Sequence, residues 1–416
     1  MLKRVIFLPF LIASICFANF SFLQAQVIKD KQYDYLGRGY LNTITTAVPF
    51  LLIAPDSRAG SLGDMGCATS ADVNSQHHNT AKYVFNKRTF GVSIAYSPWL
   101  RQLVGDINLA YLALYGKITD MDALSFSLRY FSLGSIDFTD EWGGSMGSQQ
   151  PNEFAIDLGY SRKLIDQLSI AITPRFIYSN LTAGQYVQGV ESQAGLAGAA
   201  DLSLFYQQDF RTKALANSIL RAGLNISNMG NKISYSSGTL RRDFLPTNLK
   251  LGLTYTMEFD PYNRLMLGAE INKLLVPTPP IYEDSNQRIV YDAANKPIIA
   301  RGKNPDVSVF TGILQSFYDA PGGWREEMRE IALSVGVEYS YRELFSARVG
   351  YFYESPYKGN RQYITIGGGI SYNIFAIDVA YLFTVDQHHP LENTLRFTLI
   401  FDFVSFNKQE IKRQNR

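Results

Sequence analysis

The sequence predicts an all-β protein: a transmembrane antiparallel β-barrel of about 14 strands with an N-terminal plug in its lumen. Three observations predict this class. Apolar and polar residues alternate in short runs from Thr89 onward, and the charged residues of these runs fall on one of the two alternating faces. The connections between the runs alternate between short and long. This combination is typical of strands that face lipid on one side and an aqueous lumen on the other.

The first 25 residues read as a secretory signal. Lys3 and Arg4 form a positive start, an apolar run extends to Phe22, and Leu23-Gln24-Ala25 offers a cleavage site. Cys16 lies in the apolar run without a lipobox, which disfavours a lipoprotein. Elsewhere we find no stretch of roughly 18 apolar residues that a spanning helix would need. We therefore expect an exported chain.

The stretch from Val48 to Phe85 differs from everything after it. It is dense in Gly, Ala, Ser, Asp and Asn, and it shows neither a period-2 alternation nor a helical stripe. An irregular, compact segment before a barrel is expected inside that barrel, so we predict an N-terminal periplasmic segment and lumen plug over residues 26–88. The residues that we assign to the plug are Asp56, Arg58, Gly60, Gly63, Asp64 and Asn79.

The barrel is expected over residues 89–406, followed by a polar, basic periplasmic tail at 407–416. Its strands have about the 9–11 residues that cross a bilayer. The alternating runs lie at residues 90–96, 106–117, 124–130, 154–160, 168–179, 196–207, 218–227, 248–258, 264–273, 331–339, 345–354, 361–372, 374–385 and 395–403.

The charges of these runs share the parity of the small and polar residues. Because a lipid-facing Arg or Lys at the bilayer midplane costs roughly 2–4 kcal/mol, this parity is expected to face the lumen. An ion and hydrogen-bond network that fills the lumen is favoured over a substrate path. The charged residues are Arg129, Asp157, Arg175, Asp201, Arg221, Lys250, Glu270, Glu338, Arg348, Asp378, Arg396 and Asp402.

The connections predict the orientation of the barrel. Short turns lie near 119–122, 163–167, 259–263, 341–344 and 373, and longer segments lie near 134–152, 180–194, 227–247 and 274–329. Outer-membrane barrels have short periplasmic turns and long outer loops. An even number of strands then predicts that both termini are periplasmic.

The insertion at about 274–329 is long for an ordered domain, and such loops are usually functional or disordered. Its first half is Pro-rich and polar, whereas its second half spaces apolar residues as a short helix over 307–317 that Asp306 is expected to cap. A helix folded over the barrel mouth and a docking element for another protein are both consistent with this pattern. The candidate partner-binding residues are Phe310, Phe317, Tyr318 and Trp324.

The sequence offers little for catalysis, cofactors or metals. The motifs G-x-S-x-G and H-E-x-x-H are absent, as is a glycine loop for phosphate, and the formal charge of +2 gives no reason to expect nucleic acid. His77-His78 and His388-His389 are poor chelates, because adjacent strand residues point to opposite faces. Cys67 is the only cysteine after the signal, so no intramolecular disulfide is expected. We predict neither an enzyme nor a cofactor-binding protein.

Two stretches carry a resemblance to a known family. The run LLIAPDSRAGSLGDMGCATSADVNSQHHNTAKYVF and the run FTGILQSFYDAPGGWREEMREI, from Phe310 to Ile331, resemble the PorV (LptO) family of the type IX secretion system of Bacteroidota. This family belongs to the FadL-like outer-membrane channels, in which an N-terminal hatch plugs a fourteen-stranded barrel. The Asn-Pro-Ala signature of that hatch appears here as Asn79-Thr80-Ala81, without the proline.

The resemblance implies an outer-membrane shuttle protein. Its expected partners are a translocon barrel of the SprA or Sov kind, cargo with a C-terminal signal domain, the sortase-containing attachment complex and outer-membrane lipid. A FadL-like channel for hydrophobic small molecules is the alternative, and a lipid A deacylation factor is a more distant one. The long insertion with its aromatic residues and the altered Asn79-Thr80-Ala81 signature favour the secretion component.

Overall fold

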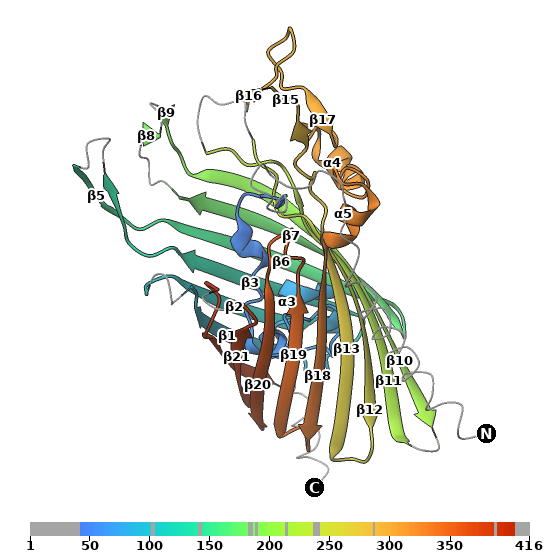
Figure 1. Ribbon diagram of the computed structural model, residues 1–416. Coiled ribbons are helices and arrows are strands. Elements are labelled where there is room, and N and C mark those ends of the chain that lie inside the picture. The colour runs from blue at the N-terminus through green and yellow to red at the C-terminus, as the bar shows by residue number, and fades with distance from the viewer. Residues whose placement is uncertain are drawn as a thin grey trace. The chain divides into compact units, whose positions relative to one another are not determined.

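The computed structural model describes residues 42–100, 105–139, 144–181, 186–187, 190–212, 215–235, 242–285, 288–386 and 389–403. Fourteen strands form a closed barrel in which every neighbouring pair is antiparallel, and they follow one another around it in chain order (Figure 1). The predicted fold class and strand count are confirmed. The strands are β1 (Phe90–Pro98), β2 (Asn108–Lys117), β3 (Asp122–Ser132), β6 (Asn152–Ile165), β7 (Leu168–Asn180), β10 (Gly195–Thr212), β11 (Leu215–Gly230), β12 (Asn248–Glu258), β13 (Asn263–Leu274), β18 (Ile331–Tyr341), β19 (Phe345–Tyr353), β20 (Gln362–Tyr372), β21 (Phe375–Thr384) and β22 (Thr394–Phe403).

The two faces of the strands differ as the alternation predicts. In β6, Asp157 is 1% exposed, whereas its neighbour Leu158 is 58% exposed. The same contrast holds between β3 and β6, where the polar Ser127 is paired with Asp157 and the apolar Phe126 is paired with Leu158. All the charges that we predicted for the lumen are buried, except for Asp402, which is partly buried. The apolar face therefore points to lipid and the charged face to the interior.

The two ends of the barrel differ in the length of their connections. One end carries tight turns, such as Arg342–Glu343 between β18 and β19 and Asn373 between β20 and β21. The other end carries the long loops, which form small hairpins and two helices (Figure 1). Since outer-membrane barrels have short periplasmic turns, we take the end with the long loops as the outer end. The loop strands are β4 (Ile136–Thr139), β5 (Ser145–Gln149), β8 (Tyr186–Val187), β9 (Val190–Glu191), β14 (Ile281–Tyr282), β15 (Asp284–Ser285), β16 (Arg288–Ile289) and β17 (Ile299–Arg301).

The segment before β1, residues 42–88, runs from the outer end of the barrel to the other end. At its start, the Asn42 N–H donates to the carbonyl of Tyr357, which lies in the long connection between β19 and β20. At its finish, Lys87 pairs with Glu343 in a short turn, and Arg88 donates to the carbonyl of Asn373 in another. We call residues 42–88 the lumenal segment. Its elements are η2 (Pro49–Leu52), α2 (Ser57–Gly60), α3 (Ser75–His78) and η3 (Thr80–Phe85).

The predicted location of the two termini concerns residues outside the described ranges. Within those ranges, the last strand, β22, ends beside β1 at the short-turn end, because Phe403 pairs with Phe90. Asn42, in contrast, lies at the outer end. The predicted signal peptide and tail also lie outside the described residues. In the part of the chain that is described, no helix has the length and apolar character needed to span a membrane.

Candidate functional site: an outer cap above the lumenal segment

The lumenal segment contacts strands on every side of the barrel. Its side chains and backbone hydrogen-bond to β3, β7, β10, β12, β13, β18, β20 and β22. The Glu270 carboxylate of β13, for example, accepts from the backbone N–H groups of Gly66 and Cys67 at 2.9 and 2.8 Å. Opposite it, Ser125 of β3 donates to Gln76. A segment that binds inward-facing groups all around a closed barrel occupies the interior of that barrel.

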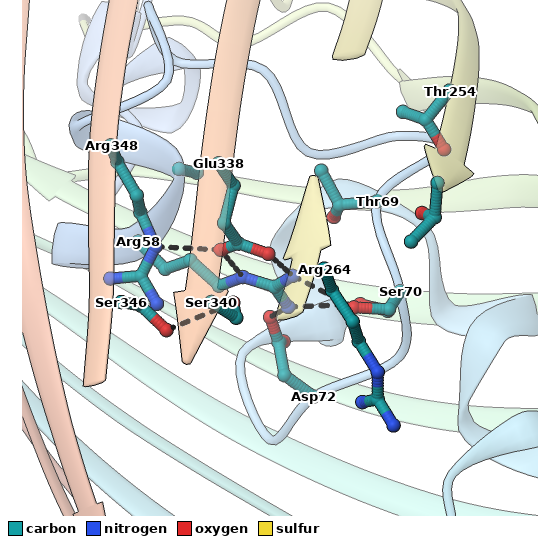
Figure 2. A network of polar contacts seen from close by, with 12 residues as sticks. Arg58, Thr69, Ser70, Asp72, Thr254, Arg264, Glu338, Ser340, Ser346 and Arg348 are labelled. Atoms are coloured by element: carbon teal, nitrogen blue, oxygen red, sulfur yellow. Dashed lines mark hydrogen bonds and ion pairs between the residues drawn. The ribbon is translucent and has the colours of Figure 1, made fainter. Parts of the chain in front are cut away.

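The Arg58 side chain joins this segment to the barrel wall (Figure 2). Its guanidinium donates to both carboxylate oxygens of Glu338 in β18, at 3.0 and 2.9 Å. It also binds Asp72 at 2.8 Å and the hydroxyl of Ser70 at 2.7 Å, within the segment itself. Glu338 in turn accepts from Arg348 of β19 at 2.6 Å. Bidentate, charge-assisted contacts of this kind fix the geometry of both partners.

Asp64 makes the second charged contact with the wall. It pairs with Arg396 of β22 and accepts from the hydroxyl of Tyr363 in β20 at 2.6 Å. The two glycines that we assigned to the plug allow this close approach. A Cβ at Gly60 would lie 2.4 Å from the Arg396 guanidinium, and a Cβ at Gly63, where φ is +67°, would lie 2.6 Å from the carbonyl oxygen of Tyr351. Larger residues at these two positions would collide with the wall.

Asp56 and Asn79 stabilise the segment from within. The Asp56 carboxylate caps α2 by accepting from the Ala59 N–H at 2.9 Å, and it pairs with His78 Nε2 at 2.7 Å. Asn79 Nδ2 donates to the carbonyls of Cys67 and of Leu204 in β10 at 3.1 and 3.0 Å. The predicted plug residues thus all lie in the lumen but at separate contacts. That they block passage through the barrel stays a prediction.

The histidine pair at 77–78 has two separate partners. His78 binds Asp56, whereas His77 Nδ1 lies 2.6 Å from the guanidinium of Arg129 in β3. Across the described ranges, no group of three or more His, Cys, Asp and Glu side chains is placed to hold a metal ion. His388 lies outside those ranges. The pair therefore acts here as part of the packing between the segment and the wall.

Above the lumen, the second half of the long insertion forms two short helices at the outer end. They are α4 (Val309–Gln315) and α5 (Trp324–Arg329), and we call residues 301–330 the outer cap. We expected Asp306 to cap the first helix, and this was wrong: the hydroxyl of Ser308 accepts from the Thr311 N–H at 3.2 Å. Asp306 instead lies 3.4 Å from Lys232. The Pro-rich first half forms the antiparallel pairs β14–β17 and β15–β16.

The four predicted partner-binding residues all lie exposed on the outer cap. Phe310 and Trp324 are 72% and 74% exposed, and Phe317 and Tyr318 are 45% and 59% exposed. Two further apolar side chains of the same helices, Leu314 and Met328, are about half exposed. These six residues, which we call the apolar patch, sit beyond the ends of the strands. Large exposed apolar groups at such a place are characteristic of interaction surfaces.

Beneath the apolar patch, five buried charges hold the outer cap on the barrel. Lys273 of β13 binds Glu327 at 3.1 Å and Glu330 at 2.6 Å. Lys358, from the connection between β19 and β20, binds Glu326 at 2.6 Å and Glu330 at 2.9 Å. All five side chains are less than 10% exposed. We call them the buried charge cluster.

Neutral groups complete the contacts of the buried charge cluster. The Glu330 carboxylate accepts from the hydroxyl of Thr278 at 2.7 Å, and Glu326 accepts from Asn42 of the lumenal segment at 2.9 Å. Backbone N–H groups of Ala320 and Gly322 donate to Glu327 and Glu326. Since buried charges are tolerated only when paired and hydrogen-bonded, these contacts fix the orientation of α5.

Two carboxyl groups of the outer cap have shifted pKa values. Burial raises the pKa of Asp319 to about 6, helped by the neighbouring charges of Glu327 and Glu330 and opposed by the hydrogen bond from the Thr278 N–H. The pKa of Glu326 is lowered: burial raises it, but the hydrogen bond and charge of Lys358 outweigh that effect, with a further hydrogen bond from Asn42. Lys358 and Asn42 thus stabilise the ionised form of Glu326.

Sequence reasoning missed the buried charge cluster. We assigned Glu326, Glu327 and Glu330 no role from the sequence, and the lysines that bind them lie at least 28 positions away in the chain. One signal was available: Lys273 lies next to the end of β13, on the parity opposite to that of the lumen-facing Glu270, so its ammonium group needs a partner near the mouth of the barrel. Only the folded chain shows which carboxylates supply it.

Comparison with known proteins gives one family. The model of the family described as "Type IX secretion system protein PorV" matches residues 38–281, which is more than half of the chain. A search of curated proteins found no match. The match covers the whole lumenal segment and the strands from β1 to β13.

Several solved structures have a similar fold. The toluene transporter TbuX of Ralstonia pickettii is 10% identical, with a TM-score of 0.44 over 84% of this chain and 98% of that chain. The P. putida toluene transporter TodX is 11% identical, with a TM-score of 0.46 over 83% and 99%. A Pseudomonas aeruginosa FadL homologue is 11% identical, with a TM-score of 0.41 over 87% and 100%.

Proposed function

Because the chain belongs to the family of type IX secretion system protein PorV, we propose that it is an outer-membrane shuttle component of that system. In this proposal it associates with the translocon barrel and binds the C-terminal signal domain of exported cargo. It then brings the cargo to the sortase-containing attachment complex. The outer cap is the surface that does the binding.

The observation that carries the proposal is the exposure of the apolar patch. Phe310 and Trp324 are each more than 70% exposed, although they lie on helices whose other faces are buried. A closed barrel does not need such a cap, since β13 and β18, which the insertion connects, pair directly with each other. Large aromatic side chains bury much area with few rotatable bonds and are common anchors of protein interfaces. A protein partner would therefore gain most of its contact area here.

The support beneath the apolar patch suits a binding role. The buried charge cluster ties α5 to β13 and to the connection between β19 and β20, which fixes the backbone that carries Trp324 and Met328. A rigid surface loses little conformational freedom on binding, so more of the contact energy appears as affinity.

The alternative of a channel for hydrophobic molecules is disfavoured by the lumen. The inward faces of the strands carry buried charges, among them Arg175 paired with both Asp157 and Asp201. The lumenal segment binds these faces on all sides, including the bidentate contact of Arg58 with Glu338. An apolar molecule that followed this path would have to break buried charged contacts, which is costly.

The test replaces two aromatic side chains of the apolar patch in cells that secrete by this system. The double variant Phe310→Ala/Trp324→Ala is expected to insert normally, because both side chains are largely exposed. Its co-purification with the translocon barrel or with cargo should fall about tenfold or more, since interface anchors often contribute 2 kcal/mol or more each. Extracellular cargo should fall accordingly. The control is Tyr291→Ala, an aromatic side chain that is 54% exposed on the hairpin of the same insertion.

Two outcomes would reject the proposal. If the double variant shows a normal barrel level, normal co-purification and normal export, the apolar patch is not a docking surface. If export is normal but uptake of a hydrophobic compound changes, the channel alternative holds instead.

A further inference from the structure

The outer cap is basic as well as apolar on its exposed side. Its carboxylates are Asp306, Asp319, Glu326, Glu327 and Glu330, and all of them except Asp306 are buried. The three glutamates point inward to Lys273 and Lys358, which come from other parts of the chain. The two lysines therefore balance two of the three negative charges beneath the outer cap.

The cations of the outer cap have the opposite distribution. Arg301, Lys303 and Arg325 are exposed, and Arg329 is partly exposed. Within the described ranges, none of these four side chains forms an ion pair. Lys303 Nζ lies 3.7 Å from the ring centroid of Tyr318, and Arg329 lies 4.4 Å from that of Tyr357. The one exposed carboxylate, Asp306, lies near Lys232. The exposed side of the cap thus carries an uncompensated positive charge.

This charge lies among the side chains of the apolar patch. Lys303 covers the ring of Tyr318, and Arg325 lies three positions before Met328 in α5, so these two residues are neighbours on the helix surface. A partner that buries these aromatic rings brings its own rim groups close to Lys303 and Arg325. Basic rim groups on the partner would be repelled, and acidic ones would be attracted.

We propose that the outer cap takes a protein surface of one chemical kind: an apolar strip flanked by carboxylates, which pair with Lys303 and Arg325. This inference rests on the proposed function and names the chemistry of the partner at the same surface. The apolar strip supplies the buried area, and the carboxylates speed association and exclude basic surfaces.

The experiment measures the association rate of the purified full-length protein in detergent micelles with the C-terminal signal domain of an exported protein from the same organism. The charge-reversal variant is Lys303→Glu/Arg325→Glu, and the neutral variant is Lys303→Gln/Arg325→Gln. Lys296→Glu, which changes an exposed cation on the neighbouring hairpin, is the matched control. Each variant is measured at low and at high salt, because interactions between exposed charges are screened by salt.

The reversal is expected to slow association about tenfold at low salt, with the neutral variant between it and the parent. The difference should shrink at high salt, and Lys296→Glu should have little effect. If reversal leaves the rate unchanged or raises it, while Phe310→Ala/Trp324→Ala weakens binding, the acidic-partner inference is overturned and the proposed function stands. If neither change weakens binding, both are overturned.

Discussion

Arg58 and Glu338 are 280 positions apart in the chain, yet the guanidinium of Arg58 binds both oxygens of the Glu338 carboxylate, at 3.0 and 2.9 Å. The pair joins the lumenal segment to β18, and Glu338 continues to Arg348 of β19. The segment and the wall of the barrel therefore share one network of charges (Figure 2). Because they share this network, the stability of the lumenal segment and that of the barrel wall should be coupled.

The first prediction concerns this pair. Arg58→Ala removes one of the two cations that neutralise Glu338 and leaves a largely buried carboxylate with less compensation. Breaking a buried ion pair typically costs about 3 kcal/mol or more. We expect the folded barrel to lose its heat-modifiable gel mobility at a lower temperature.

The matched control is Lys87→Ala, which breaks an ion pair with Glu343 whose side chains are 77% and 58% exposed. Exposed pairs contribute about 1 kcal/mol or less. Equal losses for the two variants would show that Arg58 does not hold the segment to the wall.

The second prediction concerns the course of the lumenal segment. Asn42 is tied to Glu326 and to the carbonyl of Pro279 at the outer end, and Thr43 beside it is exposed. A cysteine at Thr43 should therefore react with a membrane-impermeant maleimide in intact cells. Cys67 is fully buried and should stay silent.

The controls are cysteines at Asp166, in a short turn, and at Ala294, in an outer loop. Only the second of these should react before the cells are permeabilised. A Thr43→Cys variant that behaves like Asp166→Cys would mean that the segment runs in the other direction.

The third prediction compares the two faces of β6. Leu158 is 58% exposed near the middle of the strand, so Leu158→Arg places a charge in the lipid and should cost roughly 2–4 kcal/mol. Leu158→Ile is the control. Asp157→Asn, one position away, should be tolerated better, because Arg175 keeps its pairing with Asp201 and the amide oxygen still accepts a hydrogen bond. Barrel yield in the outer membrane reports the outcome, and equal loss for Leu158→Arg and Asp157→Asn would contradict the assignment of faces.

The fourth prediction concerns pH. The pKa of Asp319 is raised to about 6 from an ordinary value of 3.8, so the folded cap binds this proton more tightly than the unfolded chain does. Its contribution to stability is fully present below pH 3.8 and is lost as the pH rises through about 6. Glu326 affects stability in the opposite direction. Because its pKa is lowered, its contribution to the stability of the folded cap is present when the pH is above the ordinary pKa of a glutamate and is lost as the pH falls.

Hydrogen exchange of residues 309–330, corrected for the intrinsic effect of pH, should therefore show a more protected cap at pH 5 than at pH 7.5. Asp319→Asn cannot ionise but can still accept from the Thr278 N–H. It should flatten the pH dependence between these two values. If the parent protein and the Asp319→Asn variant show the same pH dependence of hydrogen exchange, Asp319 is not the titrating group.

Period and parity were enough to predict the barrel. A strand alternates its side chains with period 2, so Leu158 and Asp157 had to face opposite sides whatever the rest of the chain did. The hydrocarbon of the membrane then determines which side faces lipid and which faces the lumen, because burying Leu158 in it is favourable and burying a charge in it is costly. For the same reason, the sequence predicted burial of Arg129, Arg175 and Arg396 inside the barrel, and the structure places them there.

Helix capping was decided by geometry that the sequence pattern does not contain. Asp306 and Ser308 are both good capping residues, and they lie two positions apart. The backbone of Ser308 takes the extended conformation that a cap requires, with φ −61° and ψ 158°, and its hydroxyl reaches the Thr311 N–H. The helix therefore begins later than the apolar spacing suggested.

The sequence by itself determined the barrel, its strand count, the face that meets lipid and the presence of an irregular segment before the first strand. These features follow from local alternation and from the solvent on each side of a strand. Only the tertiary structure decided which charges meet, such as Arg58 with Glu338 and Lys358 with Glu330, and that Asn42 lies at the outer end. The physical reason is that a buried charge requires a partner, but many partners of opposite sign satisfy that requirement. The closure of the barrel selects among them by bringing distant strands to the same height.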